Sequence, residues 1–489
     1  MSAYHQAVII GSGFGGLLAA LNLRKQGIQD FIILERRAFL GGTWLQNSYP
    51  GAAVDVQSPL YSLCDEPYDW SQMFAEQKEL SEYTNYVIAK HELNKCAFTD
   101  CEVKKIAWHE REQKWYIDVA GRAPIQAQFV INATGPLSTP VTPNFTGKDS
   151  FKGASFHSNN WDHSFDYKNK RVAVIGSGAS AAQVIPAIAP DVRHLHVFQR
   201  TPHWVMPRPD YVFKNWQRKI LRSKWAYHFL RILIYWALEI RVIGFKYSRT
   251  LLDLLATRKA TAFLKKAIPD DDLREQLTPE FVIGCKRILL SSTLYPAYCR
   301  DNVTLHDKTE GIDEITETGI RTQQGSEYEL DLIVYATGFD ATDSVISYPV
   351  IGRDGKRLST FWQDYPRAYL GTTVPGFPNL FVVTGPNTGI GHTSALFVIE
   401  SQMKYIMACI WRVQANQYQA IEVKPEAEEQ YTRLIHKEMA KTVWHTGGCD
   451  SWYKSKSGKV IAMFPGFSFT FRRWASNFKH ADHHFYGSK

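Results

Sequence analysis

Residues 7–16 read AVIIGSGFGG, a short apolar run that leads directly into a glycine-rich turn. The residues that follow, LLAALNLRKQG at 17–27, place apolar side chains at helical spacing. Strand, tight turn and helix in this order are typical of a dinucleotide-binding unit, because a turn without side chains lets a pyrophosphate approach the free amides of the helix N-terminus. We expect Gly11, Gly13 and Gly16 to form such a turn.

An acidic residue ends the next predicted strand, FIILE at 31–35. Glu35 lies 24 residues after Gly11. A carboxylate at this position accepts hydrogen bonds from ribose hydroxyls. The first unit therefore suits the adenosine half of FAD or NAD.

The chain repeats the whole unit. RVAVI at 171–175 leads into GSGASA at 176–181, and the strand LHVFQ ends at Arg200, again 24 residues after the first glycine. A cation at this position can pair with a 2′-phosphate, which favours NADPH over NADH. The candidate NADPH contacts are Gly176, Gly178, Ser180, Ala181, Gln183, Arg200 and Thr201.

Each unit closes with a similar strand and turn, FVINATG at 129–135 and DLIVYATG at 331–338. Such apolar runs are typical of buried parallel strands. We predict an α/β fold with two Rossmann-like dinucleotide-binding domains. The predicted division gives residues 1–140 and 332–489 to the FAD domain and 141–331 to the NADPH domain, with a helical insert at about 208–282.

Composition indicates an ordinary globular protein of 489 residues. Its seven cysteines are odd in number and form no CxxC pair, which predicts reduced thiols and a cytoplasmic location. Cys96 and Cys101 have the spacing of a flavin disulfide reductase, but they lie far beyond the first glycine loop. We expect both to be unpaired. The N-terminal residues resemble no export signal.

The formal charge of +8 is concentrated in one block. Residues 208–249 hold ten Lys or Arg against Asp210 and Glu239. Three interpretations stay open for this insert: a lid over a substrate tunnel, a basic surface resting on anionic lipid, or helices packed on the nucleotide domain. Its apolar run at 232–238 is too short to span a bilayer.

No metal site and no nucleic-acid partner is expected, and the oligomeric state is open. His480, His483 and His484 cluster near the end of the chain, where such side chains are usually solvated.

Between the two units, residues 151–162 read FKGASFHSNNWD. This stretch resembles the FxGxxxHxxxW(P/D) fingerprint of type I Baeyer-Villiger monooxygenases, flavoenzymes that insert an oxygen atom beside a ketone carbonyl. The matching residues are Phe151, Gly153, His157, Trp161 and Asp162. The resemblance implies that this linker couples domain rotation, with His157 acting through conformation.

Residues 41–55, GGTWLQNSYPGAAVD, resemble a second pattern of that family. The resemblance implies that this loop covers a flavin and that Asp55 lies beside its reacting face, with Tyr61 following. The flavin contacts it implies, besides the first glycine loop and Glu35, are Thr43, Trp44, Asp55, Tyr61, Val103 and Ala395.

The third resemblance is CKR at 285–287, which implies that Arg287 is the essential arginine and that Lys286 helps bind the NADPH phosphate. A permanently charged guanidinium can stabilise an anionic oxygen nucleophile and the anionic adduct it forms. Asp55 would orient it. The family's usual Tyr-Tyr is Tyr295-Pro296 here.

Together these features predict an NADPH- and FAD-dependent enzyme that converts ketones and dioxygen to esters or lactones. The ending from Cys449 to Tyr453 resembles the branch that acts on linear and aryl ketones. The alternatives are a flavin monooxygenase of nitrogen or sulfur compounds, a long-chain hydroxylase, and a non-catalytic flavoprotein.

Overall fold

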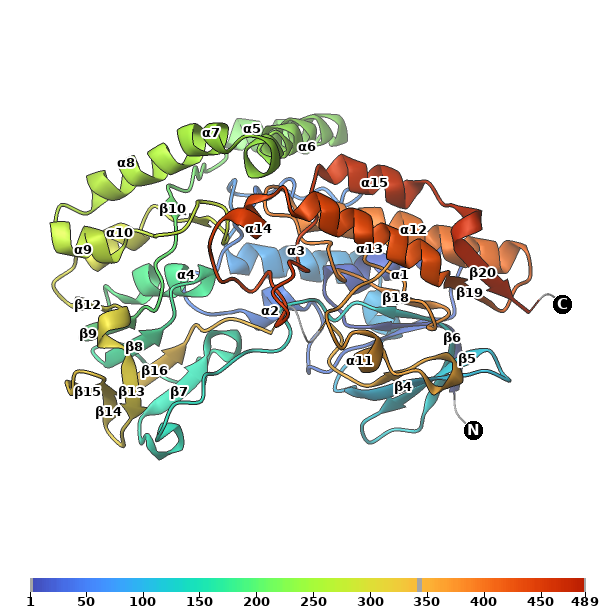
Figure 1. Cartoon of the computed structure of the whole chain (residues 1–489), viewed down its shortest axis with the longest axis horizontal. Coiled ribbons are helices and arrows are strands. Elements are labelled where there is room, and N and C mark those ends of the chain that lie inside the picture. Colours follow the sequence, from blue (N-terminus) through green and yellow to red (C-terminus); the bar gives the residue numbers. More distant parts are fainter. Residues whose placement is uncertain (1–2, 341–344, 488–489) are drawn as a thin grey trace.

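A computed structural model describes residues 3–340 and 345–487. Two separate sheets, each covered by helices, make up the body of the molecule (Figure 1). The predicted α/β class is confirmed. Apolar residues alternate between the two faces of both sheets, so each sheet has a core on either side.

The first sheet is built around β1, which pairs in parallel with β2 on one side and β6 on the other. Its path runs β17-β4-β5-β6-β1-β2-β3, and β18 also pairs with β6. The strands are β1 (Ala3–Ile10), β2 (Phe31–Leu34), β3 (Ala97–Phe98), β4 (Val103–His109), β5 (Lys114–Val119), β6 (Ile125–Asn132), β17 (Val350–Ile351) and β18 (Leu380–Val382).

One face of this sheet packs against helices from both ends of the chain. Ile9, Ile33 and Ile131 point to that face, whereas Val8, Ile32 and Val130 point to the other. The helices near this sheet are α1 (Phe14–Lys25), α3 (Gln77–Lys90), α12 (Ala395–Ala415), α13 (Pro425–Met439) and α15 (Ser468–Ser476).

The second sheet is entirely parallel and has the order β12-β9-β8-β16-β7. Helices α4 (Ala179–Ile188) and α10 (Leu294–Tyr298) contribute to the core on one face. A small antiparallel sheet, β13 (Ile312–Ile315), β14 (Gly319–Thr322) and β15 (Glu327–Glu329), contributes to the core on the other. The five parallel strands are β7 (Ala154–His157), β8 (Arg171–Ile175), β9 (His194–Phe198), β12 (Val303–His306) and β16 (Leu332–Tyr335).

The stretch 151–162 differs from its prediction as a linker. Ala154–His157 form edge strand β7, paired with β16 along its whole length. Phe151 packs against the core of the second sheet. The fingerprint therefore belongs to the second sheet and is fixed in it.

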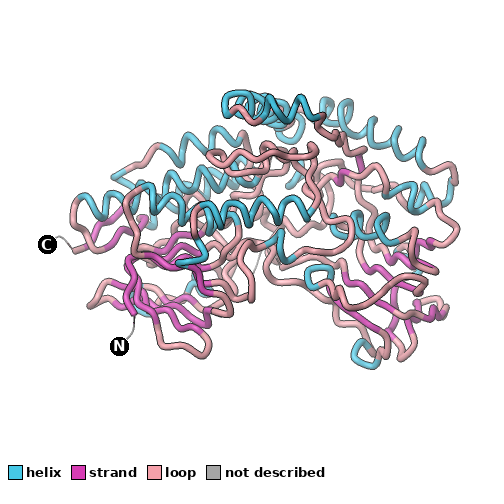
Figure 2. The backbone as a smooth tube through the Cα atoms, turned by 180° about the vertical axis from the view of Figure 1, so that it is seen from behind, coloured by secondary structure: helices cyan, strands magenta, loops and turns pink. Residues whose placement is uncertain are grey.

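The helical insert lies along one edge of the molecule in both views (Figures 1 and 2). Its helices are α5 (Asn215–Leu221), α6 (Lys224–Glu239), α7 (Arg249–Leu252), α8 (Arg258–Ala267) and α9 (Asp271–Gln276). Over residues 3–340 and 345–487, every helix is too short or too polar to cross a membrane.

The C-terminal histidines are more ordered than we predicted. His483 begins β20 (His483–Tyr486), which pairs with β19 (Ala420–Val423). Its ring is buried and contacts the Tyr405 hydroxyl at 2.6 Å and the Lys479 carbonyl at 2.8 Å. The prediction of solvated side chains is wrong for His483, because the tail adds a strand to the fold.

The prediction of reduced thiols is wrong for two cysteines. Cys285 and Cys449 form a disulfide between buried residues 164 positions apart. Spacing could not reveal this pair, since the fold alone brings their Cα atoms to 6.1 Å. Cys96 and Cys101 are free thiols.

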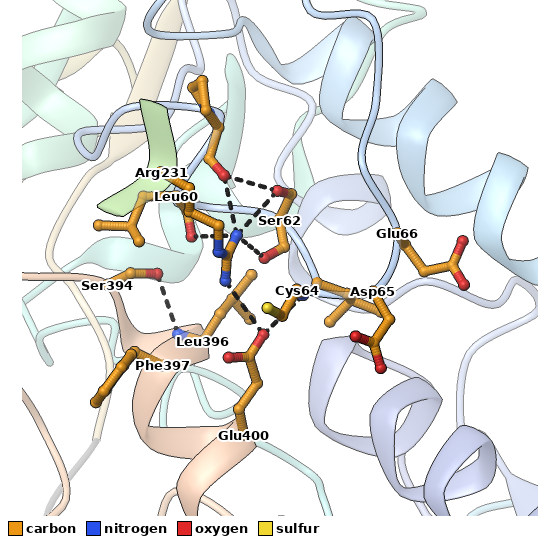
Figure 3. Close-up of polar contacts among 12 residues, drawn as sticks. Leu60, Ser62, Cys64, Asp65, Glu66, Arg231, Ser394, Leu396, Phe397 and Glu400 are labelled. Atoms are coloured by element: carbon orange, nitrogen blue, oxygen red, sulfur yellow. Dashed lines mark hydrogen bonds and ion pairs between the residues drawn. The ribbon is translucent and has the colours of Figure 1, made fainter. Parts of the chain in front are cut away.

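Arg231 anchors the insert to the first sheet's domain (Figure 3). Its guanidinium donates to the carbonyls of Pro59 and Ser62, at 2.9 and 2.7 Å, and pairs with Glu400 on α12 at 3.2 Å. Both charged side chains are less than a tenth exposed. Helix α6 is thereby fixed to the loop that carries Tyr61.

We expect Arg231→Met to lower the free energy of unfolding by about 3–5 kcal/mol, because it leaves the buried Glu400 carboxylate without its cation. Arg222→Met removes an exposed ion pair with Asp69 and should cost at most about 1 kcal/mol. Urea unfolding of both variants measures the difference. Equal effects would show that the buried pair does not anchor the insert. Adding Glu400→Met to Arg231→Met should recover part of the loss.

Candidate active site

The first glycine turn follows β1 at its carboxyl end. Gly11 has φ +103°, and a Cβ there would lie 2.5 Å from the Ala133 carbonyl oxygen. A Cβ at Gly16 would lie 1.9 Å from the Gly11 carbonyl oxygen. By contrast, a Cβ at Gly13 would meet only the Cα of Gly42, at 3.8 Å. The outer glycines are required by the protein itself, whereas Gly13 leaves room for a ligand.

The second turn, after β8, repeats this arrangement. Gly176 has φ +125°, and a Cβ would lie 2.3 Å from the Ala336 carbonyl oxygen. At Gly178 a Cβ would meet nothing within 4 Å. The third position is Ala181, whose methyl group is buried. Both turns lie where β1 and β8 have neighbours on either side, the usual ligand position in an open parallel sheet.

Glu35 closes the first turn. One carboxylate oxygen accepts hydrogen bonds from the Ser12 amide at 3.0 Å and the Ser12 hydroxyl at 2.7 Å, and the other accepts from the Arg37 amide at 2.9 Å. The side chain is buried. These bonds hold an acceptor beside the turn, where a ribose would lie.

Cations gather beside the second turn. Arg200 is exposed and lies two residues after the end of β9. Burial and the Arg200 charge lower the pKa of Lys286. Burial and the Lys286 charge lower the pKa of His203 to about 4. The Ser177 hydroxyl donates to the Thr201 carbonyl at 2.7 Å, which ties the turn to this cluster. The arrangement suits a phosphate.

Gln183, predicted as a nucleotide contact, also makes hydrogen bonds to the 49–53 loop. Its amide oxygen accepts from the Tyr49 hydroxyl at 2.9 Å, and its amide nitrogen donates to the Ala53 carbonyl at 2.9 Å. A Cβ at Gly51, where φ is +79°, would lie 2.5 Å from the Gln183 carbonyl oxygen. Gln183 therefore holds the 49–53 loop against α4. The Ser180 hydroxyl, from the same helix, also faces Tyr49, whose pKa is raised by burial.

Three aromatic rings, from residues before and after Asp55, lie together near the first glycine turn. Trp44, in α2 (Thr43–Gln46), donates its indole N–H to the Tyr61 hydroxyl at 3.2 Å, and the two rings meet edge to face. Phe14 contacts Tyr61 from the side of the first turn. Burial raises the pKa of Tyr61 to about 12. Trp44 and Tyr61 thus hold each other in place, and Phe14 connects them to the first glycine turn.

The two units meet at an ion pair between Arg287 and Asp55. The guanidinium Nε lies 2.5 Å from the Asp55 carboxylate, and each side chain is about a third exposed. The Asp55 charge raises the pKa of Arg287 above its ordinary value. Arg287 precedes β11 (Leu289–Leu290), which pairs with β10 (Val205–Met206). An arginine from one unit is therefore aimed by a carboxylate from the other.

Tyr453 is a residue of this site that the sequence analysis did not assign to it. Burial raises the pKa of Tyr453 to about 12, and the charges of Arg287 and Asp55 also act on its hydroxyl. The Cys285–Cys449 disulfide links the Arg287 segment to the tail that carries Tyr453. The motif CDSWY was visible in the sequence, but nothing in it indicated the distance to Arg287.

The fingerprint contacts the first unit through Asn159, which no pattern singled out. Its side-chain oxygen accepts from Gln46 at 2.5 Å and lies 3.5 Å from Arg37. The backbone N–H of Asn159 donates to His157 Nδ1 at 3.1 Å. Burial lowers the pKa of His157. This contact links β7 to the helix that carries Trp44.

The other fingerprint residues are explained by packing. A Cβ at Gly153 would lie 2.5 Å from the Phe151 ring. Trp161 is buried against Phe156 and Tyr167. Asp162 is exposed and accepts from the amide and hydroxyl of Ser164, which lowers its pKa.

Two predicted flavin contacts lie on the first sheet's domain. Val103 is buried at the start of β4. Ala395 is the first residue of α12, whose N-cap is Ser394. Among the described residues, no group of three or more His, Cys, Asp or Glu could hold a metal ion.

Comparisons with known proteins place the chain in a family. A family model described as pyridine nucleotide-disulphide oxidoreductase matches residues 8–244. A Baeyer-Villiger monooxygenase of Pseudomonas aeruginosa is 41% identical over 98% of this chain and 91% of its own length. One of Streptomyces coelicolor is 42% identical over 96% of this chain and 90% of its own length.

A crystal structure of OTEMO in complex with FAD and NADP superimposes with a TM-score of 0.89 and 26% identity, over 99% of this chain and all of the other. Fold, site geometry and sequence similarity over nearly the full length agree, and the chain belongs to the Baeyer-Villiger monooxygenases.

Proposed function

We propose that this protein uses NADPH, FAD and dioxygen to insert an oxygen atom beside the carbonyl of linear or aryl ketones. The observation that carries the proposal is the Arg287–Asp55 ion pair, which joins the unit that carries Glu35 to the unit that carries Arg200. The proposal can be tested with the purified protein and small ketones.

The residues of the first unit fit a flavin dinucleotide. Gly13 leaves space at the helix N-terminus for a pyrophosphate, and Glu35 offers an acceptor for a ribose. Trp44 and Tyr61 would border the ring system. When bound, the flavin supplies the electrons and the oxygen chemistry that the protein side chains lack.

Arg287 would stabilise the negative charge that develops on oxygen during the insertion. Its Nε donates to Asp55, and its terminal N–H groups make no other hydrogen bond within the described residues, so they could donate to an anionic oxygen. Because its pKa is raised, the guanidinium keeps its proton while it donates. Asp55 fixes the plane of the guanidinium and offsets its charge in the free enzyme.

The second unit would bind NADPH through Arg200 and Lys286. The open space at Gly178 admits the pyrophosphate, and the cations beside the turn would pair with the 2′-phosphate. Asn159 and Gln183 then connect the NADPH unit to the flavin loop through Gln46 and Tyr49.

We further propose the cytoplasm as the location. Five of the seven cysteines are free thiols. The one disulfide joins buried residues, which protects it from a reducing solvent.

Arg287→Ala should lower the rate of ester formation by at least about 100-fold, since one preorganised donor to a developing oxyanion is typically worth that much. NADPH oxidation should continue, because the nucleotide turns are unchanged. Product yield and NADPH consumption are measured together, with Arg222→Ala as the control for loss of a surface charge. Unchanged ester formation would remove Arg287 from the mechanism.

Arg200→Ala should raise the KM for NADPH by about 10- to 100-fold, the loss of one or two charge-assisted hydrogen bonds. The KM for NADH should change little, because NADH has no 2′-phosphate. Arg193→Ala is the matched control, at the opposite end of β9. A similar increase for both nucleotides would assign Arg200 to general folding or to the pyrophosphate.

The reaction class is tested by product mass under isotopically labelled dioxygen with 2-octanone, phenylacetone, cyclohexanone and a thioether. Esters of the first two ketones that carry one labelled atom are expected. Sulfoxide without any ester would assign the enzyme to heteroatom oxidation instead. A lactone from cyclohexanone alone would contradict the proposed substrate class while leaving the reaction intact.

A further inference from the structure

The outward face of α6 is apolar along its whole length. The side chains on it recur at helical spacing, and each is at least half exposed: Trp225, Phe229, Ile232, Leu233, Trp236 and Ile240. Trp225, at 77% exposed, stacks on Phe229 without burying it. A surface helix normally presents polar side chains to water, so this face is unusual for a solvated protein.

Neighbouring elements extend the same surface. Trp216 and Ile220 of α5, and Leu254 and Leu255 after α7, are all exposed by about half or more. Phe469, at the start of α15, contacts Trp236. We call these residues and the outward face of α6 the apolar ridge; helices α5, α6 and α7 lie along the outer edge of the molecule in Figure 1.

The buried face of α6 prevents the helix from turning the apolar ridge inward. Arg231 is held by Glu400 and by backbone carbonyls. About two helical turns on, the buried Glu239 carboxylate accepts from the Ser468 amide and hydroxyl and contacts His392 at 3.2 Å. A rotation of α6 would leave two charges buried without partners, which costs several kcal/mol for each. The ridge is thus fixed outward.

The segment that carries most of the apolar ridge has an excess of basic residues. The structure describes all of residues 211–267, and only one exposed acid, Asp253, lies among them. The exposed cations of this segment are Lys214, Lys219, Arg222, Lys224, Arg241, Arg249, Arg258, Lys259, Lys265 and Lys266. Two copies of this surface facing each other would repel, whereas an anionic surface complements it.

We propose that the apolar ridge docks on the surface of an anionic lipid bilayer. Tryptophan is the residue most suited to the headgroup region, and the ridge contains three, Trp216, Trp225 and Trp236. Each Lys or Arg near an anionic bilayer strengthens binding by electrostatic attraction. The helices would lie in the plane of the interface and would not cross it.

Flotation of the purified holoenzyme with vesicles tests the proposal. The protein should float with phosphatidylglycerol-containing vesicles at least about tenfold better than with phosphatidylcholine alone, and about 1 M salt should abolish most of the difference. Trp225→Ser combined with Trp236→Ser should remove flotation. Trp411→Ser, which changes a comparably exposed tryptophan on α12, is the matched control and should float as the wild type does.

Light scattering on the same variants tests the alternative that a second copy of this chain binds the apolar ridge. A wild-type dimer that the Trp225→Ser, Trp236→Ser variant converts to monomer, without flotation of either protein, would overturn the proposal in favour of a second copy of this chain. Equal flotation with both vesicle types, or loss in the Trp411 variant, would also overturn it. Ketone oxidation in solution is measured in parallel, so failure of lipid binding is distinguished from failure of the proposed reaction.

Discussion

The candidate site depends on one interaction, the Arg287–Asp55 ion pair, which joins a segment of the second unit to a loop of the first. The loop before Asp55 is held by a contact from the other unit, whereas the segment of Arg287 is held by a short sheet next to it. The 49–53 loop is fixed by Gln183, and the Arg287 segment by the short sheet of β10 and β11. Removing either support would misplace the pair without touching it.

Much of the fold was predictable because the nucleotide turns impose strict local requirements. Gly11 and Gly176 have positive φ and lie too close to a carbonyl oxygen for a side chain, so only glycine fits there. Gly13 and Gly178 are open for a different reason, the approach of a ligand. Local requirements of this kind can be read from the sequence, and the same holds for the short apolar runs that form the strands.

The unpredicted features depend on segments far apart in the chain. The Cys285–Cys449 disulfide, the Arg231–Glu400 pair and the position of Tyr453 each join residues more than 150 positions apart. No local pattern encodes such a meeting. Strand β7 was not predicted, because Ala154–His157 is only four residues long and its burial does not alternate regularly.

The disulfide has a mechanical consequence for motion between the two units. It fastens the segment of Arg287 to the C-terminal tail, and that tail is in turn bound to the loop before α12 through Asn387 and Gly389. A cross-link permits its ends to swivel but not to separate. If the NADPH sheet moves against the flavin sheet during turnover, the disulfide keeps the segment of Arg287 next to the C-terminal tail throughout that motion.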